Sequence, residues 1–111
     1  MTPCILTTRH DSDQVVLDSP YDADFVGAFK RLVPHLDREP IYEHHSVVGD
    51  SKTFKYWRFK RGHWAAVTEL CLATYSEVYH EHITETGEID KWDLRTGEKL
   101  ATQGNLFNAQ T

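Results

Sequence analysis

Short β-rich runs alternate along this chain with two segments of helical periodicity, and that alternation favours an α+β fold. The runs at residues 5–8 and 14–18 flank a polar stretch with turn chemistry, so they predict an N-terminal hairpin. Residues 37–61 predict further strands joined by a loop, with a turn signal at 49–51.

Two helices are expected between these strands. The first begins after a Ser-Pro pair at 19–20 and is apolar at helical spacing as far as Pro34, which indicates an end near residues 33–36. The second runs from Trp64 to Val78, because apolar side chains there step by three and four positions.

With 111 residues, the chain is expected to form one compact domain. The elements predict an α+β domain with two helices on one face of a small antiparallel sheet, in the order β-β-α-β-β-α. Residues 88–100 predict a C-terminal hairpin that turns at 95–98. We therefore expect a compact domain at 1–83, with a hairpin and a frayed tail at 84–111 packed on the same domain.

The net charge of −5 is unevenly distributed. Residues 1–50 carry nine acids and four bases, residues 51–76 carry one acid and five bases, and residues 77–111 carry seven acids and three bases. Attraction to phosphate depends on local positive charge, so the middle block is where a polyanion is expected to bind.

The expected location is the reducing cytoplasm. No apolar run approaches the roughly 20 residues that a membrane span needs, and no signal peptide is visible. The two cysteines, Cys4 and Cys71, form no recognisable disulfide framework.

Residues 52–61 interleave five cations with four aromatic rings. Cations neutralise phosphates and an exposed ring can stack on a base, so the segment suits nucleic acid. Alternation along a strand places Lys55, Trp57 and Phe59 on one face and the residues between them on the other, so some rings must face the core. The other interpretation is a strand whose rings are all core and whose cations are solvated or paired with acids. The candidate nucleic-acid contacts are Arg38, Lys52, Lys55, Tyr56, Trp57, Arg58, Lys60 and Arg61.

One stretch of the chain resembles a known family. The pattern Tyr21-Asp22-x-x-Phe25-Val26-x-x-Phe29-Lys30-x-x-Val33-Pro34, followed by Arg38 and later by Trp57-x-Phe59, is similar to the small HARP-type module of annealing helicases and mobile-element proteins. The resemblance spans roughly residues 5–80. It departs from the family at Pro40, where an aromatic residue is expected, and at an apparent insertion over 43–50. It implies a non-catalytic accessory fold that contacts DNA or a DNA-processing partner through Lys30, Arg38 and the strand around Trp57.

Catalysis and metal binding have weaker support. The histidine clusters at 43–45 and 80–82 have no metal-ligand spacing, and no nucleophile or phosphate-loop motif occurs. Cys71 lies on the apolar stripe of the second helix and is expected to be a buried, unreactive thiol. We therefore expect no enzyme activity, no metal and no cofactor.

The expected function is that of a nucleic-acid-associated accessory protein, contacting DNA or RNA through the basic and aromatic strand. The alternative is a small phage- or plasmid-encoded protein that binds a host enzyme and modulates or inhibits it. The expected partner is nucleic acid or a protein partner of a nucleic-acid enzyme. A homodimer is possible in either case.

Overall fold

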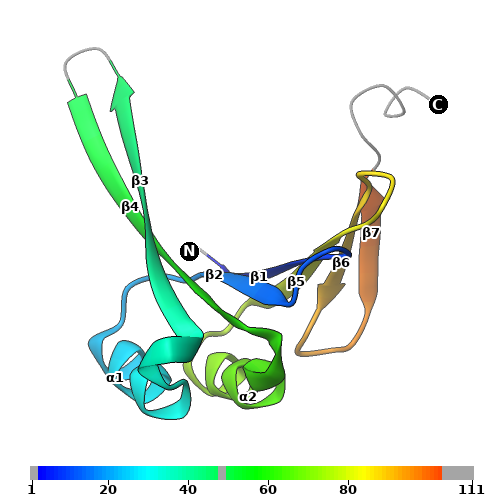
Figure 1. Cartoon of the computed structure of the whole chain (residues 1–111). Helices are drawn as coiled ribbons and strands as arrows, with labels where there is room; N and C mark the ends of the chain where they lie inside the picture. Colours follow the sequence, from blue (N-terminus) through cyan, green and yellow to red (C-terminus); the bar gives the residue numbers. More distant parts are fainter. Residues whose placement is uncertain (1–2, 48–49, 104–111) are drawn as a thin grey trace.

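The computed structural model describes residues 3–47 and 50–103, without the side chains of 43–47, 50–54 and 101–103. It contains a seven-stranded sheet in the order β3-β4-β2-β1-β5-β6-β7, with both helices on one face (Figure 1). The strands are β1 (Cys4–Arg9), β2 (Gln14–Asp18), β3 (Arg38–Val47), β4 (Asp50–Lys60), β5 (Val78–Ile83), β6 (Ile89–Asp93) and β7 (Lys99–Gln103). The helices are α1 (Ala23–Leu32) and α2 (Trp64–Thr74), with short 3₁₀ turns η1 (His35–Asp37) and η2 (Arg61–His63).

The predicted α+β class, the order β-β-α-β-β-α and the placement of both helices on one face are confirmed. The sheet is mixed, however, and not purely antiparallel as expected. Strands β1 and β5 pair in parallel, with Cys4 opposite Val78. The reason is the α2 crossover, which returns the chain to the same end of the sheet, so that β5 runs in the same direction as β4.

The second helix is shorter than predicted, and a strand follows it. Helix α2 ends at Thr74, and the extended residue Tyr75 donates its backbone N–H to the Cys71 carbonyl. Val78 continues the helical spacing of apolar residues, but it begins β5 and is fully buried there. Val78 is buried in the same core as the apolar side chains of α2. For this reason an apolar residue stands at position 78, and the helical spacing seen in the sequence included it.

The core lies between the helices and the sheet. Phe29 of α1 packs against Trp57 and Phe59 of β4, with ring centroids 5.2 Å and 5.9 Å away. The buried apolar side chains among the described residues are Cys4, Leu6, Val15, Leu17, Phe25, Phe29, Val33, Trp57, Phe59, Val67, Cys71 and Val78. The Trp57 and Phe59 side chains of β4 therefore belong to the core.

Helix α1 is found where a helix is predicted, but it begins at Ala23, so that the proline of the Ser-Pro pair at 19–20 lies before its first turn. The Asp22 side chain caps it by accepting a hydrogen bond from the Phe25 backbone N–H at 2.9 Å. Lys30 and Arg31 lie in its last turn, where the helix dipole favours cations. This end of α1 lies beside β3 and β4, and so it carries Lys30 to the edge of the sheet (Figure 1).

The sheet is strongly curved. The β3–β4 ribbon and the β6–β7 hairpin rise from the middle strands on the side away from the helices, which makes the open face concave (Figure 1). Both predicted hairpins, β1–β2 and β6–β7, are confirmed. The division at residue 83 stays a prediction, and Gly49 of the turn signal and the last residues of the expected tail lie outside the described residues. In the described part of the chain, no helix is long and apolar enough to cross a membrane.

Candidate nucleic-acid interface

The basic and aromatic segment divides between the two faces of the sheet, as its alternation predicts. Trp57 and Phe59 face the helices and are 8% and 0% exposed. Tyr56 and Arg58 lie on the concave face and are partly exposed. The two sets of side chains therefore cannot contact one ligand together.

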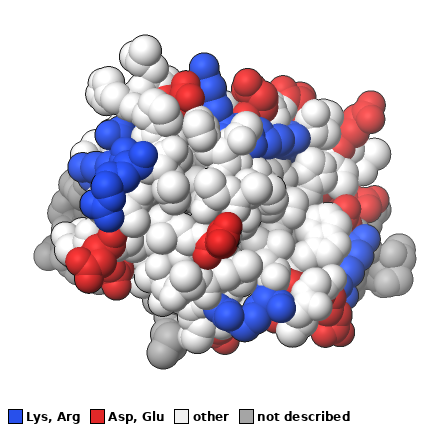
Figure 2. Space-filling model, turned by 90° about the horizontal axis from the view of Figure 1, so that it is seen from below, with Lys and Arg blue, Asp and Glu red and all other residues white. Residues whose placement is uncertain are grey.

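Three of the predicted site residues meet in a groove on the helix side, beside the end of α1. The groove has a volume of about 280 Å³, and we call it the basic groove; it is lined by Lys30, His35, Arg38, Pro40, Tyr42, Lys55 and Trp57. Among the side chains that the structure describes, its lining has three permanent cations and no acidic group. Figure 2, seen from the helix side, shows Lys and Arg gathered at the left edge, next to a group of acidic residues; α1 and the β3–β4 ribbon lie on that side in Figure 1.

Two lysines lie over the ring at the floor of the basic groove. Lys55 Nζ is 4.5 Å and Lys30 Nζ is 5.7 Å from the centroid of the Trp57 indole. Attraction between each ammonium group and the ring holds both cations in place. Two like charges gathered over one ring favour an anion between or beside them.

Arg38 contributes a hydrogen-bond donor that the described residues leave unused. The Arg38 Nε atom is buried and has no hydrogen-bond partner among the described residues. The carboxylates nearest in sequence are already engaged, because Glu39 pairs with Arg58 and Asp37 with His63 and Lys60. An unpaired buried donor costs roughly 1–3 kcal/mol, and because Nε has almost no exposed surface, an oxygen of a bound anion can remove that cost only after the Arg38 side chain shifts.

The tyrosine at the rim of the basic groove was not predicted. Tyr42 lies opposite Lys55 in the β3–β4 ladder and is 62% exposed. Lys55 Nζ is 5.8 Å from the centroid of its ring. The alternation of Arg38, Pro40 and Tyr42 along one strand was the signal that could have identified it. His35 and Pro40 were also missed, whereas Lys30 was expected from the family resemblance.

Two of the remaining predicted cations are matched to carboxylates outside the basic groove. Arg58 Nη1 lies 2.5 Å from a carboxylate oxygen of Glu39, and Lys60 Nζ lies 3.4 Å from Asp37. The hydrogen bond with His63 and the nearby Lys60 ammonium keep the pKa of the Asp37 carboxyl below its usual value.

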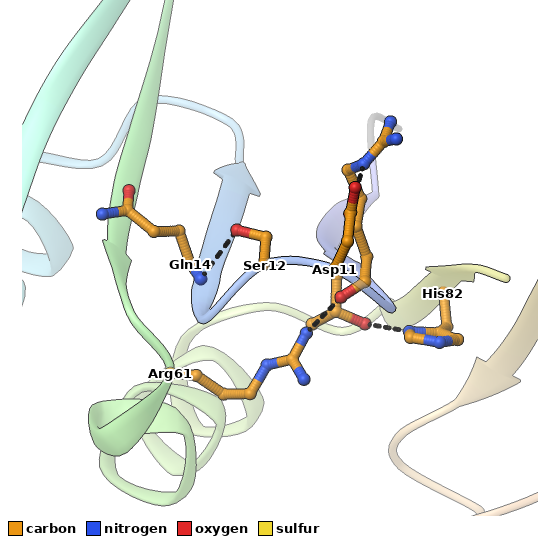
Figure 3. A network of polar contacts seen from close by, with 7 residues as sticks. Asp11, Ser12, Gln14, Arg61 and His82 are labelled. Carbon is orange, nitrogen blue, oxygen red and sulfur yellow. Dashed lines mark hydrogen bonds and ion pairs between the residues drawn. The ribbon is translucent and has the colours of Figure 1, made fainter. Parts of the chain in front are cut away.

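Two further predicted contacts lie apart from the basic groove. Arg61 donates a hydrogen bond from Nη2 to the Arg9 carbonyl at 2.9 Å, so its side chain points toward the β1–β2 turn (Figure 3). Lys52 lies in β4, and its side chain is outside the described set.

A larger concavity of about 450 Å³ lies on the open face of the sheet. Its lining includes Arg9 and Arg58, but Arg9 pairs with Asp11 at 3.2 Å and Arg58 pairs with Glu39. An anion bound there would compete with these carboxylates. The smaller basic groove, which has no acid in its lining, is therefore the better anion site.

The histidines of β5 form a packed cluster. His80 Nε2 and His82 Nδ1 each lie 2.7 Å from Thr8 Oγ1, and Figure 3 shows His82 directed at this hydroxyl. The His80 ring lies 4.6 Å from Trp64 and 5.1 Å from Trp92, centroid to centroid. Burial, His82 and Arg61 lower the pKa of His80 to about 4. Within the described residues no group of three or more His, Cys, Asp or Glu is placed to hold a metal ion.

The two cysteines lie together in the core. Cys71 is buried, as predicted, and its hydrogen bond with Cys4 together with burial raises the pKa of the Cys71 thiol. Both thiols are free. The raised pKa keeps the Cys71 thiol protonated and a poor nucleophile, and Cys4 is fully buried and out of reach of a substrate, so neither is a candidate catalytic group.

Comparisons of the chain with models of protein families, with curated proteins and with solved structures found no match. The resemblance to the HARP-type module therefore stays a prediction.

Proposed function

We propose that the protein is a non-catalytic accessory protein that binds nucleic acid through the basic groove. The observation that carries the proposal is the lining of this groove, in which Lys30, Arg38 and Lys55 surround two aromatic rings without a carboxylate among them. Phosphates are attracted by such a local concentration of cations even where the whole chain has a net charge of −5. The acidic remainder of the chain limits non-specific binding.

The proposed contact does not include every residue of the predicted basic and aromatic strand. Arg58 and Lys60 belong to ion pairs on the other face, so phosphate contacts are assigned to the three cations of the basic groove. Two to three neutralised phosphates correspond to a slope of about −1.4 to −2 in a plot of log affinity against log salt for a single strand. Binding is thus expected to be modest and to be observed best at low salt.

Charge reversal tests this assignment. The double variant Lys30→Glu, Lys55→Glu should lose binding to short DNA or RNA at low salt. The matched control is Lys91→Glu, Lys99→Glu, which makes the same change in net charge; Lys99 Nζ also lies 5.7 Å from a tryptophan ring, that of Trp92. Equal loss in both double variants, or no binding by the wild type at low salt, would refute the proposal.

A second candidate function is the binding of a protein partner through the helices. Tyr21, Leu32 and Leu36 flank or belong to α1 and are 85%, 42% and 88% exposed. A shallow concavity between the helices is lined by Leu32, Ala66, Glu69, Leu70 and Ala73. Leu32 lies in this concavity, and exposed apolar side chains that line a concavity are typical of protein interfaces, with a partner protein or a second copy of the chain.

Co-purification separates the two candidates. A stoichiometric protein partner, recovered without nucleic acid and lost in the variant Leu32→Glu, would favour the helix surface. The two buried, free cysteines fit a reducing compartment, and we propose that either function operates in the cytoplasm.

A further inference from the structure

We infer that the basic groove takes a single strand of nucleic acid, with one unpaired base stacked on Tyr42. This inference rests on the proposed function and specifies the form of nucleic acid that the groove accepts. It also replaces Trp57 by Tyr42 as the stacking ring.

Trp57 is not available for stacking. Its side chain is 8% exposed and packs against Phe29 in the core. The ammonium groups of Lys30 and Lys55 lie over what remains of its surface. A base could reach this ring only by displacing two cations that attract the strand.

Tyr42 differs from Trp57 in its exposure, although the Lys55 ammonium group also lies 5.8 Å from the Tyr42 ring centroid. Its side chain is 62% exposed at the rim of the groove, and it lies directly opposite Lys55 in the β3–β4 ladder. Facing residues in a ladder have Cβ atoms roughly 5 Å apart, so a base on the tyrosine would leave its phosphate within reach of the lysine. A ring beside a cation is the combination with which proteins hold single strands.

The shape of the site favours a single strand over a duplex. Elements that read a duplex project into its grooves, whereas these cations line a hollow of about 280 Å³. The bases of a duplex are stacked and paired inside it, so none is free to pack on an exposed ring. Tyr42 is four positions after Arg38 in β3, which is about 13 Å along a strand, so the extended backbone can pass from one to the other.

The test compares a fluorescently labelled single-stranded oligonucleotide of about 12 residues with a duplex of the same sequence, at low salt. Both DNA and RNA strands are used, because the groove chemistry is common to them. The variants are Tyr42→Ala, Tyr42→Phe and, as a matched control, Tyr21→Ala, which removes another highly exposed tyrosine.

The wild type should bind the single strand more tightly than the duplex. Tyr42→Ala should weaken binding to the single strand roughly 5- to 100-fold, the range for loss of one base stack, and should leave duplex binding unchanged. Tyr42→Phe and Tyr21→Ala should both bind like the wild type.

Failure of the single-strand inference can be distinguished from failure of the proposed function. If Tyr42→Ala binds the single strand like the wild type while Lys30→Glu, Lys55→Glu loses binding, the single-strand inference is wrong and the proposed function stands. Duplex binding as tight as single-strand binding by the wild type likewise overturns the inference. If the wild type binds neither form, the inference and the proposed function are both wrong.

Discussion

Lys55 Nζ lies 4.5 Å from the centroid of the Trp57 ring, two positions along the same face of β4. The lysine is exposed and the tryptophan is buried, so the pair joins the surface of the basic groove to the core. The Trp57 indole contacts the Lys55 ammonium group and also packs on the Phe29 ring. Lys55 and Trp57 were both predicted as nucleic-acid contacts, but they have different functions: Lys55 belongs to the surface of the basic groove and Trp57 to the core.

Trp57 should matter for stability rather than for stacking. Trp57→Ala should lower the free energy of unfolding by about 3–5 kcal/mol, because it opens a cavity beside Phe29. Urea denaturation measures this loss. Trp57→Phe, which keeps a ring in the core, should lose less and should still bind nucleic acid. A change below about 1 kcal/mol for Trp57→Ala would contradict the core position of this ring.

Arg38 and Arg58 should differ in their effect on binding. Arg38→Gln should weaken nucleic-acid binding roughly 10-fold, the value of one charge-assisted hydrogen bond. The free energy of unfolding should not fall, because Arg38 Nε has no hydrogen-bond partner among the described residues to lose. Arg58→Gln, which breaks an exposed pair with Glu39, should leave affinity within about twofold of the wild type. Anisotropy titrations at one low salt concentration check the order, and the reverse order would place the contact on the concave face.

His80 should make the fold sensitive to acid. Its pKa is about 4 in the folded protein and 6.5 in the unfolded reference, so the unfolded chain binds more protons between these values. The free energy of unfolding should therefore be highest above pH 6.5 and should fall as the pH drops toward 4. The expected loss from this group is about 1–2 kcal/mol, because its ring is partly exposed to solvent.

Urea denaturation at several pH values between 7 and 4 measures this dependence. In His80→Gln, the change in stability across this range should be smaller than in the wild type, whatever the stability at neutral pH. Carboxyl groups with a lowered pKa, such as that of Asp37, also contribute to the free energy of unfolding. Their contribution is lost at lower pH, below the usual Asp pKa of 3.8. An identical pH dependence in His80→Gln would contradict the position of His80.

The cap of α1 should contribute a smaller amount. Asp22→Ala removes the acceptor for the Phe25 backbone N–H and should lower the free energy of unfolding by about 1 kcal/mol. Asp24→Ala is the control, because Asp24 lies in the first turn but is not the capping residue. Thermal denaturation of the two variants checks the prediction, and equal losses would show that helix-dipole charge rather than capping is responsible.

The local features of the fold could be predicted from the sequence because short segments determine them. The N-terminal hairpin and a helix shortly after the Ser-Pro pair at 19–20 follow from turn and helix-start chemistry within a few residues. The parallel pairing of β1 with β5 could not be predicted in this way, because it depends on a crossover between distant parts of the chain. The histidines and the glutamate of residues 80–82 also weaken the apolar pattern from which a strand is recognised.

The candidate site could be predicted only in part. Alternation correctly separated Lys55 and Trp57 from Arg58, but it does not reveal which face of a strand the helices cover. The basic groove also needs Lys30 from α1 and Tyr42 from β3, which tertiary packing alone brings to Lys55. For the same reason the ion pairs that engage Arg58 and Lys60 were not specified by the sequence.

Mapping backbone amide chemical shifts during titration with a single-stranded oligonucleotide tests the position of the contact most directly. We predict that the largest changes occur at Lys30, Arg38, Tyr42 and Lys55, and that they diminish as salt is added. Changes centred on Arg9 and Arg58 at the concave face, or no changes at low salt, would contradict a nucleic-acid site in the basic groove.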